Sequence, residues 1–397
     1  MDKIENEEQP LYTLQFGLLC LSSLLFSASF NMIIPELPNY LSSLGGAAHK
    51  GLIIALFTLT AGISRPFSGR LTDKWGRVPV MAIGSTVCVI CGFLYPFLSS
   101  VSGFFLLRLV HGFSTGFKPT ATSAYISDII PSNRWGEALG MHGLCFSIGG
   151  AVGPAIGSYI ASNFDLNTMF YSSSAFAFFS IIIVMNMKET LKDKKRFSPE
   201  MLKISRRDII EFRVIPAAVV TLLSYTAYGV ILTLIPDWSE HLGISNKGLF
   251  FTAYTLASIG IRFVSGKVAD RYGRIKVMKV GLIVIAISIL YLGFGNSVTH
   301  LVIGACLYGI GTGIFSPAVN AWTIDLSLPQ YRGKAMATMY IALEAGIGFG
   351  ALFAGYIYHD HILRIPYIFY GNAIIILLAF FYVIHWNSKN KKTNNLL

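Results

Sequence analysis

The sequence predicts an all-α membrane protein with twelve transmembrane helices in two related halves. Of its 397 residues, 53% are hydrophobic and only 13% are charged, about half the charged fraction of a soluble domain. Apolar stretches of about 20 residues, enough for a helix to cross a bilayer, recur along the whole chain. One residue pattern also occurs twice, 197 positions apart, which is typical of transporters built from internal repeats.

The apolar stretches follow one another in order, separated by charged or turn-forming residues. Some of these stretches nearly lack charged residues, whereas others contain a cation within the apolar run, such as Arg65 or Arg262. The twelve expected spans are residues 11–35, 51–69, 78–98, 102–127, 136–160, 167–187, 214–236, 247–266, 277–295, 299–324, 335–358 and 365–386.

The distribution of lysine and arginine predicts the orientation of these spans. With a cytoplasmic N-terminus, the cytoplasmic segments hold 24 of the 31 basic residues, and the outer loops hold only Lys50, Lys247 and Arg364. This bias predicts that both termini are cytoplasmic. The net charge of +11 therefore reflects topology, and we expect no nucleic-acid partner. The basic stretch 188–213 is read as a linker, with binding of anionic lipid headgroups as a secondary role. We expect no cleavable signal peptide, because the first apolar run is long enough to span.

The repeated pattern has the form G-x-x-x-D-x-x-G-R. Its copies are residues 69–77 and 266–274, and each follows an arginine by four residues. The same offset relates other pairs: Gly112 and Gly309, Gly116 and Gly313, Asp128 and Asp325, Gly153 and Gly350, and Tyr159 and Tyr356. One offset that holds over about ninety residues indicates that both halves share one architecture.

These residues resemble the major facilitator superfamily of secondary transporters. The cytoplasmic loop motif of that family, between its second and third spans, is G-x-L-x-D-x-x-G-R. The first copy matches it fully, and the second has Val268 in place of leucine. The resemblance covers nearly the whole chain. It implies two pseudo-symmetric six-helix bundles, residues 1–187 and 214–397, joined by the linker 188–213 and working by alternating access.

The resemblance implies that this loop motif is a latch that closes the cytoplasmic side. Its glycines allow close helix approach or a tight turn. Its aspartate can face a helix N-terminus of the opposite bundle, and its arginine can pair with an acid at the inner end of the fourth or tenth span. A structural loop with solvated charges is the alternative. The candidate latch residues are Gly69, Asp73, Gly76, Arg77 and Asp128, and Gly266, Asp270, Gly273, Arg274 and Asp325.

The fourth span carries polar residues at spacings of three and four, which places them on one helix face. These residues are Arg108, His111, Thr115, Lys118, Thr122 and Tyr125. Two cations inside a bilayer are costly, so this face is expected to line water or protein. Arg108, Gly112 and Gly116 resemble the R-x-x-x-G-x-x-x-G motif of the family, in whose proton-coupled members the arginine is linked to proton transfer. Snorkelling of Arg108 to the outer interface is the alternative.

The fifth span contains Gly149, Gly153, Pro154 and Gly157. This arrangement resembles the G-x-x-x-G-P-x-x-G motif of the family's drug and metabolite exporters. The glycines permit close helix packing and the proline bends the helix. The motif favours export, with a packing seam of no directional meaning as the alternative.

Glu344 and His142 are the expected carriers of a coupling proton, because each is titratable and lies inside a span. His111 and Arg108 are further candidates, and a structural hydrogen bond is the alternative for a lone histidine. The expected substrate-binding residues lie on the spans that line the family's central cavity. They are Lys118, Arg108, Thr115, Thr122, Asn31, Tyr225, Tyr228, Tyr308, Thr312 and Asn320.

Together these features predict proton-coupled export of a small anionic or zwitterionic molecule by a monomer in a bacterial cytoplasmic membrane. A proton-coupled importer or a uniporter uses the same fold, and a non-transporting membrane sensor is an alternative of another class. We expect no enzymatic activity, cofactor or metal, since the sequence has no nucleotide-binding loop, metal-ligand cluster or nucleophile–base pattern. Cys88 and Cys91 lie within an apolar stretch and are read as packing residues.

Overall fold

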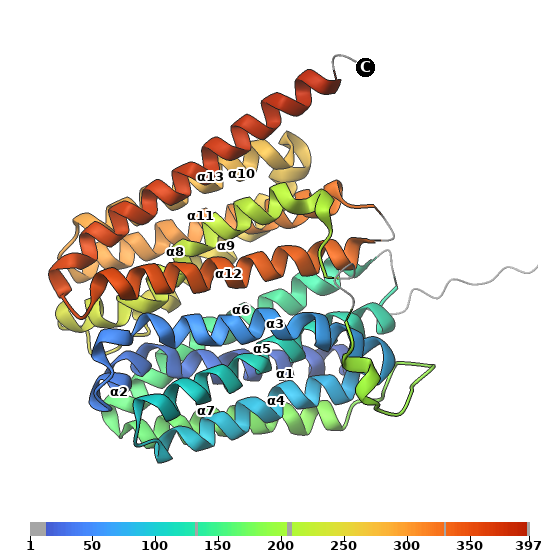
Figure 1. Cartoon of the computed structure of the whole chain (residues 1–397), viewed down its shortest axis with the longest axis horizontal. Coiled ribbons are helices and arrows are strands. Elements are labelled where there is room, and N and C mark those ends of the chain that lie inside the picture. The colour runs from blue at the N-terminus through green and yellow to red at the C-terminus, as the bar shows by residue number, and fades with distance from the viewer. Residues whose placement is uncertain (1–12, 132–133, 205–208, 329–330, 395–397) are drawn as a thin grey trace, which may run out of the picture.

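The computed structural model describes residues 13–131, 134–204, 209–328 and 331–394. Within these ranges it describes all side chains except those of residues 135, 136, 263, 266, 267, 270 and 390–394. The described backbone is helical with connecting turns and contains no strand. The helices run roughly side by side, with those of the first half of the chain below those of the second half in Figure 1.

Six long helices form the first half of the chain. They are α1 (Leu14–Ile33), α3 (Gly51–Lys74), α4 (Arg77–Leu94), α5 (Val101–Ile129), α6 (Trp135–Asn163) and α7 (Leu166–Met185). Short helical segments join α1 to α3: η1 (Ile34–Glu36), α2 (Leu37–Ser43) and η2 (Ala47–His49). A turn at η3 (Tyr95–Phe97) joins α4 to α5, and the stretch after α7 contains η5 (Pro199–Leu202).

The second half begins at η7 (Phe212–Val214) and repeats this pattern. Its long helices are α8 (Ile215–His241), α9 (Leu249–Tyr272), α10 (Arg274–Phe294), α11 (Val298–Leu326), α12 (Arg332–Tyr358) and α13 (Ile365–Asn394), with η9 (Ile362–Arg364) before the last.

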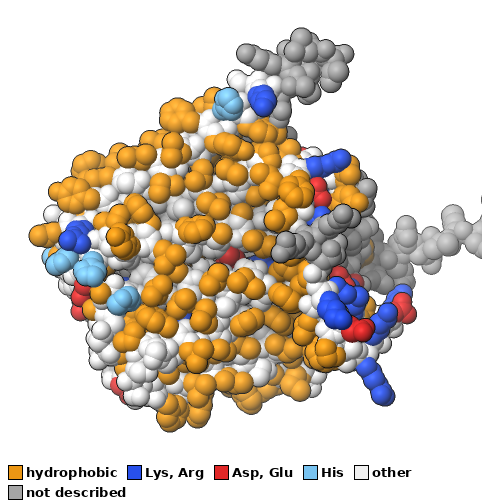
Figure 2. Space-filling model, in the orientation of Figure 1, with side chains coloured by type: hydrophobic (Ala, Val, Ile, Leu, Met, Phe, Trp, Pro, Cys, Tyr) orange, Lys and Arg blue, Asp and Glu red, His pale blue; other side chains and the backbone are white. Residues whose placement is uncertain are grey.

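Among the described residues, ten helices are long and apolar enough to cross a membrane. The other two long helices are α5, which carries Arg108 and Lys118, and α9, whose apolar stretch is limited to Leu249–Arg262. Hydrophobic side chains cover the lateral surface in Figure 2, and charged side chains gather at the two ends. This distribution is that of a multi-pass integral membrane protein, because only apolar side chains are stable against lipid.

Two helices extend further than their apolar stretches. α3 and α9 continue through the repeated motif and end at Lys74 and Tyr272, so the motif aspartates lie in the last helical turn rather than in a loop. Each helix is followed by a glycine with positive φ, 143° at Gly76 and 92° at Gly273. Only glycine adopts such angles without strain, which explains why the motif requires glycine at the turn.

Glycines bring two pairs of helices into close contact, α6 with α1 and α12 with α8. A Cβ atom at Gly153 would lie only 2.5 Å from the carbonyl oxygen of Ala28. The positions of Gly149 and Gly157 are similarly blocked by the backbone of α1, and those of Gly346 and Gly350 by the backbone of α8. Pro154 follows Gly153 inside α6 without ending the helix.

We expect Gly153→Ala to destabilise the protein, because the added methyl group has no space against α1 and overpacking typically costs about 1–3 kcal/mol. Gly143→Ala, earlier on the same helix, is the matched control, since nothing lies within 4 Å of its Cβ position. The measurement is the apparent melting temperature of the purified protein in detergent. Equal melting temperatures for the two variants would contradict the packing of α6 on α1.

Candidate functional site

Three pairs of cations are related by the 197-residue offset of the repeat. The two members of each pair lie at equivalent positions, or levels, along the helices of the two halves. Lys50 and Lys247 precede α3 and α9, Arg65 and Arg262 lie within these helices, and Arg77 and Arg274 begin the next ones. The first two pairs make contacts between the halves of the chain. The third pair contacts acids within its own half. We call these levels the lysine clamp, the arginine layer and the motif layer.

In the lysine clamp, Lys50 of the first half binds two carboxylates of the second half. Its Nζ atom lies 2.6 Å from Asp237 Oδ2 and 2.6 Å from Asp360 Oδ1. The Tyr358 hydroxyl also donates to Asp237, at 2.7 Å. Burial alone lowers the pKa of the Lys50 ammonium, but the two carboxylates outweigh this effect and raise it above its ordinary value. Lys50 is therefore held in its charged form.

Lys247 makes the reciprocal connection from the second half to the first. Its Nζ atom lies 3.7 Å from Glu36 Oε2 and 2.7 Å from Glu240 Oε2. Ser158 donates to Glu36 at 2.7 Å, and Asn39 donates to Glu240 at 2.7 Å. Each half thus supplies a cation that binds an acid at the end of the other half's first long helix.

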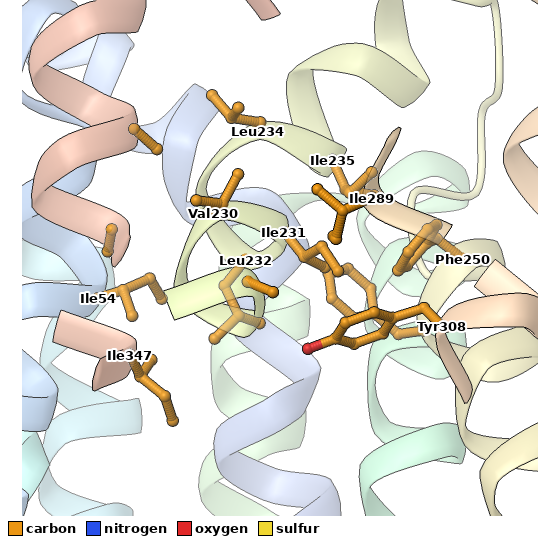
Figure 3. Close-up of a cluster of buried hydrophobic side chains, with 14 of the residues drawn as sticks. Ile54, Val230, Ile231, Leu232, Leu234, Ile235, Phe250, Ile289, Tyr308 and Ile347 are labelled. Atoms are coloured by element: carbon orange, nitrogen blue, oxygen red, sulfur yellow. The ribbon is translucent and has the colours of Figure 1, made fainter. Parts of the chain in front are cut away.

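The halves are also packed tightly beside the clamp. A Cβ atom at Gly51 would lie 2.9 Å from the Cα atom of Gly355, and one at Gly248 would overlap the backbone of Pro154. Buried apolar side chains continue this contact inward, from Ile54 on α3 and Ile347 on α12 to Val230 and Leu234 on α8 (Figure 3). The molecule is therefore closed at the clamp end.

The arginine layer contains one ion pair and one unequal counterpart. Arg65 on α3 donates from Nη2 to Glu344 Oε1 on α12 at 2.6 Å, and its guanidinium lies 5.1 Å from the ring centre of Tyr340. Arg262 on α9 donates from Nη1 to Ser147 Oγ on α6 at 3.2 Å. Ser147 and Glu344 are themselves 197 positions apart. The repeat therefore places serine in one half where the other half has a carboxylate.

The cations of α5 lie inside the first half. Arg108 donates from Nε to the Ile53 carbonyl at 2.8 Å and stacks over Phe57, 4.5 Å from the ring centre. Lys118 donates to the hydroxyls of Ser22, Ser85 and Ser180. Neither cation contacts Glu344. Glu344 instead binds Arg65.

The remaining candidates for binding or proton transfer are distributed over both halves. His111 contacts Cys88 Sγ at 3.2 Å and Tyr95 Oη at 3.4 Å, and His142 contacts Ser23 Oγ at 2.8 Å. Several polar side chains bond carbonyls of their own helix: Asn31, Thr115, Thr122 and Thr312. Tyr225 lies beside Phe315, Tyr228 and Tyr308 flank Tyr254, and Asn320 is half-buried on α11.

In the motif layer, each arginine contacts the acid expected from the sequence. Arg77 Nε lies 2.9 Å from Asp128 Oδ2, and Arg274 Nε lies 3.4 Å from Asp325 Oδ2. Asp73 is 72% exposed, and its ion pair is with Arg77 at 3.5 Å rather than with a helix of the other half. The Asp270 side chain lies outside the described residues, and Gly266 is described by its backbone conformation alone. At Gly69, no atom lies within 4 Å of the position that a Cβ atom would occupy.

Sequence reasoning missed Glu189, which holds the start of α4. Its carboxylate accepts the backbone N–H groups of Arg77 and Val78, both at 3.1 Å, where a helix N-terminus favours an anion. The sequence analysis also assigned no role to Arg65, Ser147 and Arg262. Comparing the halves position by position would have identified them, because Arg65 aligns with Arg262 and Ser147 with Glu344.

Comparisons with known proteins agree with this architecture. The multi-drug resistance efflux pump PmrA of Streptococcus pneumoniae is 28% identical over 313 residues, covering 75% of this chain and 77% of the pump. The multidrug resistance protein MdtG of Dickeya zeae is 25% identical over 386 residues, covering 93% of each chain.

Two solved structures share the fold. The human organic anion transporter MFSD10 has a TM-score of 0.73 at 19% identity, and the match covers 94% of this chain and 100% of that chain. A D-xylose-proton symporter has a TM-score of 0.74 at 17% identity, and the match covers 92% of this chain and 96% of that chain. The model of the Major Facilitator Superfamily matches residues 19–216 and 217–396. The resemblance seen in the motifs is thus confirmed, and the chain belongs to this superfamily of transporters, which are not enzymes.

Proposed function

We propose that this protein exports a small anionic or zwitterionic organic molecule in exchange for protons, by alternating access. The observation that carries the proposal is the Arg65–Glu344 ion pair, which joins the two halves within the length of their helices. Titratable charges in a membrane interior are expensive and are usually retained for function. An ion pair between moving parts can couple protonation to their movement.

The proposal includes twelve spans in two six-helix bundles, residues 1–187 and 214–397, joined by the linker 188–213. The repeat of long helices in both halves supports it, with α5 and α9 added to the ten apolar helices. The bias of basic residues supports cytoplasmic termini in a bacterial inner membrane. On this topology the lysine clamp faces outward, and the conformation described here is closed to the outside. The motif layer then faces the cytoplasm.

Export is favoured by two observations. The relatives PmrA and MdtG are a multi-drug resistance efflux pump and a multidrug resistance protein. The fifth long helix, α6, also carries the glycine–proline arrangement that resembles the exporter motif, and it packs closely on α1. We infer that α6 slides or tilts as a unit against the second half during transport, since its seam with α9 belongs to the interface between the halves.

The charge balance between the halves supports an anionic or zwitterionic substrate. Arg108 and Lys118 are enclosed by first-half helices, so in this conformation they contribute little at the interface. Among the described side chains, the arginine layer instead carries Arg65 and Arg262 against one acid, Glu344. Two cations and one anion leave a positive excess, which attracts a negatively charged group.

We expect Lys50→Met to open the clamp end, because Asp237 then remains buried without its partner. Breaking a fully buried ion pair costs about 3–5 kcal/mol. Because Asp360 is partly exposed, we expect the closed clamp end to lose about 2 kcal/mol of stability relative to the open one. The measurement is the distance distribution between spin labels at Ser43 and His361, read by pulsed electron paramagnetic resonance. Lys276→Met, exposed at the other end, is the control. An unchanged distribution in Lys50→Met would show that the clamp does not hold this end closed.

We expect Asp73→Asn to slow transport about two- to fivefold, on the scale of a lost charge–dipole contact. Asp73 is exposed here, so its latch contact belongs to the alternate conformation. Transport is measured in inside-out vesicles with whichever compound of a panel of benzoate, phenylacetate and ethidium the wild-type protein accumulates. Asp193→Asn in the exposed linker is the control, and wild-type rates in Asp73→Asn would refute the latch.

We expect Glu344→Gln to abolish transport driven by a pH gradient while preserving substrate exchange at equilibrium, because exchange needs no net proton movement. Both processes are measured in proteoliposomes, with Glu200→Gln, an exposed acid, as control. Gradient-driven transport that persists in Glu344→Gln but disappears in His142→Ala would assign the proton to the histidine. If both variants remain coupled to the gradient, the protein uses a proton site elsewhere, whereas a wild-type protein that the gradient does not drive would be a uniporter.

A further inference from the structure

The arginine layer contains a guanidinium whose charge has no carboxylate partner among the described side chains. Within the described residues, Arg262 makes one hydrogen bond, to Ser147 at 3.2 Å. Its Nε atom is buried and has no hydrogen-bond partner in the described part of the chain. A guanidinium offers five N–H donors in a fixed fork. An unpaired cation at this depth is costly, so a functional use is expected.

Its counterpart shows what such a site binds. Arg65 and Arg262 occupy equivalent positions, and both lie at a contact between the halves. Arg65 binds the carboxylate of Glu344, whereas the position equivalent to Glu344 is Ser147. The two arginines thus contact equivalent positions of the other half, and these positions differ by one negative charge. A carboxylate from outside the chain would give Arg262 the same pairing that Glu344 gives Arg65.

The neighbours of Arg262 indicate the rest of the ligand. Tyr254 lies on the same helix as Arg262, eight residues before it, or about two helical turns. Tyr254 also packs against Tyr228 and Tyr308, with ring centres 6.0 and 5.4 Å apart. Aromatic side chains bind flat apolar bodies well. The site thus combines one cation with a wall of tyrosines from the second half.

We propose that Arg262 binds the carboxylate of the transported molecule, between α6 and α9, and that the tyrosines contact its aromatic or apolar body. This assignment rests on the proposed transport function and names the residue that selects the substrate. A planar guanidinium binds a carboxylate through two parallel hydrogen bonds. Serine at position 147 is essential to the proposal, because an acid there would occupy the guanidinium and exclude the ligand.

The test is equilibrium binding of labelled benzoate and phenylacetate to the full-length protein in detergent, each compared with its neutral amide. We expect the wild-type protein to prefer the carboxylate. Arg262→Gln should weaken carboxylate binding about tenfold or more, the scale of a lost hydrogen bond to a charged group, and should leave the amide unaffected. Arg271→Gln, exposed on the same helix, is the control and should bind both like the wild type.

The sharper variant introduces the missing acid. Ser147→Glu should form an ion pair with Arg262, keep or raise the melting temperature, and bind the carboxylates about tenfold or more weakly than Ser147→Gln, which has the same size without the charge. Retained melting temperature shows that Ser147→Glu is folded. Equal carboxylate binding by Ser147→Glu and Ser147→Gln would overturn the assignment.

Other outcomes also decide. A wild-type protein with no preference for either carboxylate over its amide would refute the site, and an equal loss in Arg65→Gln but not in Arg262→Gln would move it to Arg65. Transport is assayed separately in proteoliposomes. Binding that depends on Arg262, without any proton-driven movement of the bound compound, would contradict the proposed transport function and leave the binding site standing.

Discussion

The pairing of buried cations across the two halves is the interaction on which the rest of this structure depends. Apolar helices cannot leave a lysine or arginine in lipid without a partner. Here Lys50 and Lys247 each find that partner in the opposite half, and so does Arg65. Three ion-paired cations thus lie where the halves meet. Their pairing fixes which end of the molecule is closed, because a separated pair would leave a buried charge exposed to an apolar environment.

The two halves keep the same frame, but their chemistry differs in the arginine layer. Glycine seams, clamp lysines, layer arginines and motif arginines all repeat at one offset. The departure is at Ser147 and Glu344, where one half has a neutral side chain and the other an acid. A proton site and a ligand site can therefore occupy equivalent positions in one molecule. Each arginine has a different partner, so that under the proposed function protonation and binding are separate events.

Much of this could be predicted from the sequence, because repeats and apolar lengths report directly on architecture. The helical fold followed from the apolar lengths, and the resemblance carried by the motifs implied the family and the contacts of Arg77 with Asp128 and Arg274 with Asp325. Partner choice could not be predicted for Lys118 or Glu344. Helical spacing places residues on one face but does not say which neighbour that face meets. Lys118 meets three serines of its own half, and Glu344 meets an arginine 279 positions away.

The arginine layer lies closer to one end of α3 than to the other, so a rotation of the helix about this layer moves its two ends by different distances. Arg65 lies 15 residues from Lys50 and nine from Lys74, or about 22 Å and 14 Å of helix. A rigid rotation of about 10° around this level moves the clamp end by roughly 4 Å and the motif end by roughly 2 Å. Groups at the pivot hardly move. A proton and a ligand held there can stay in place while the two ends open and close in turn.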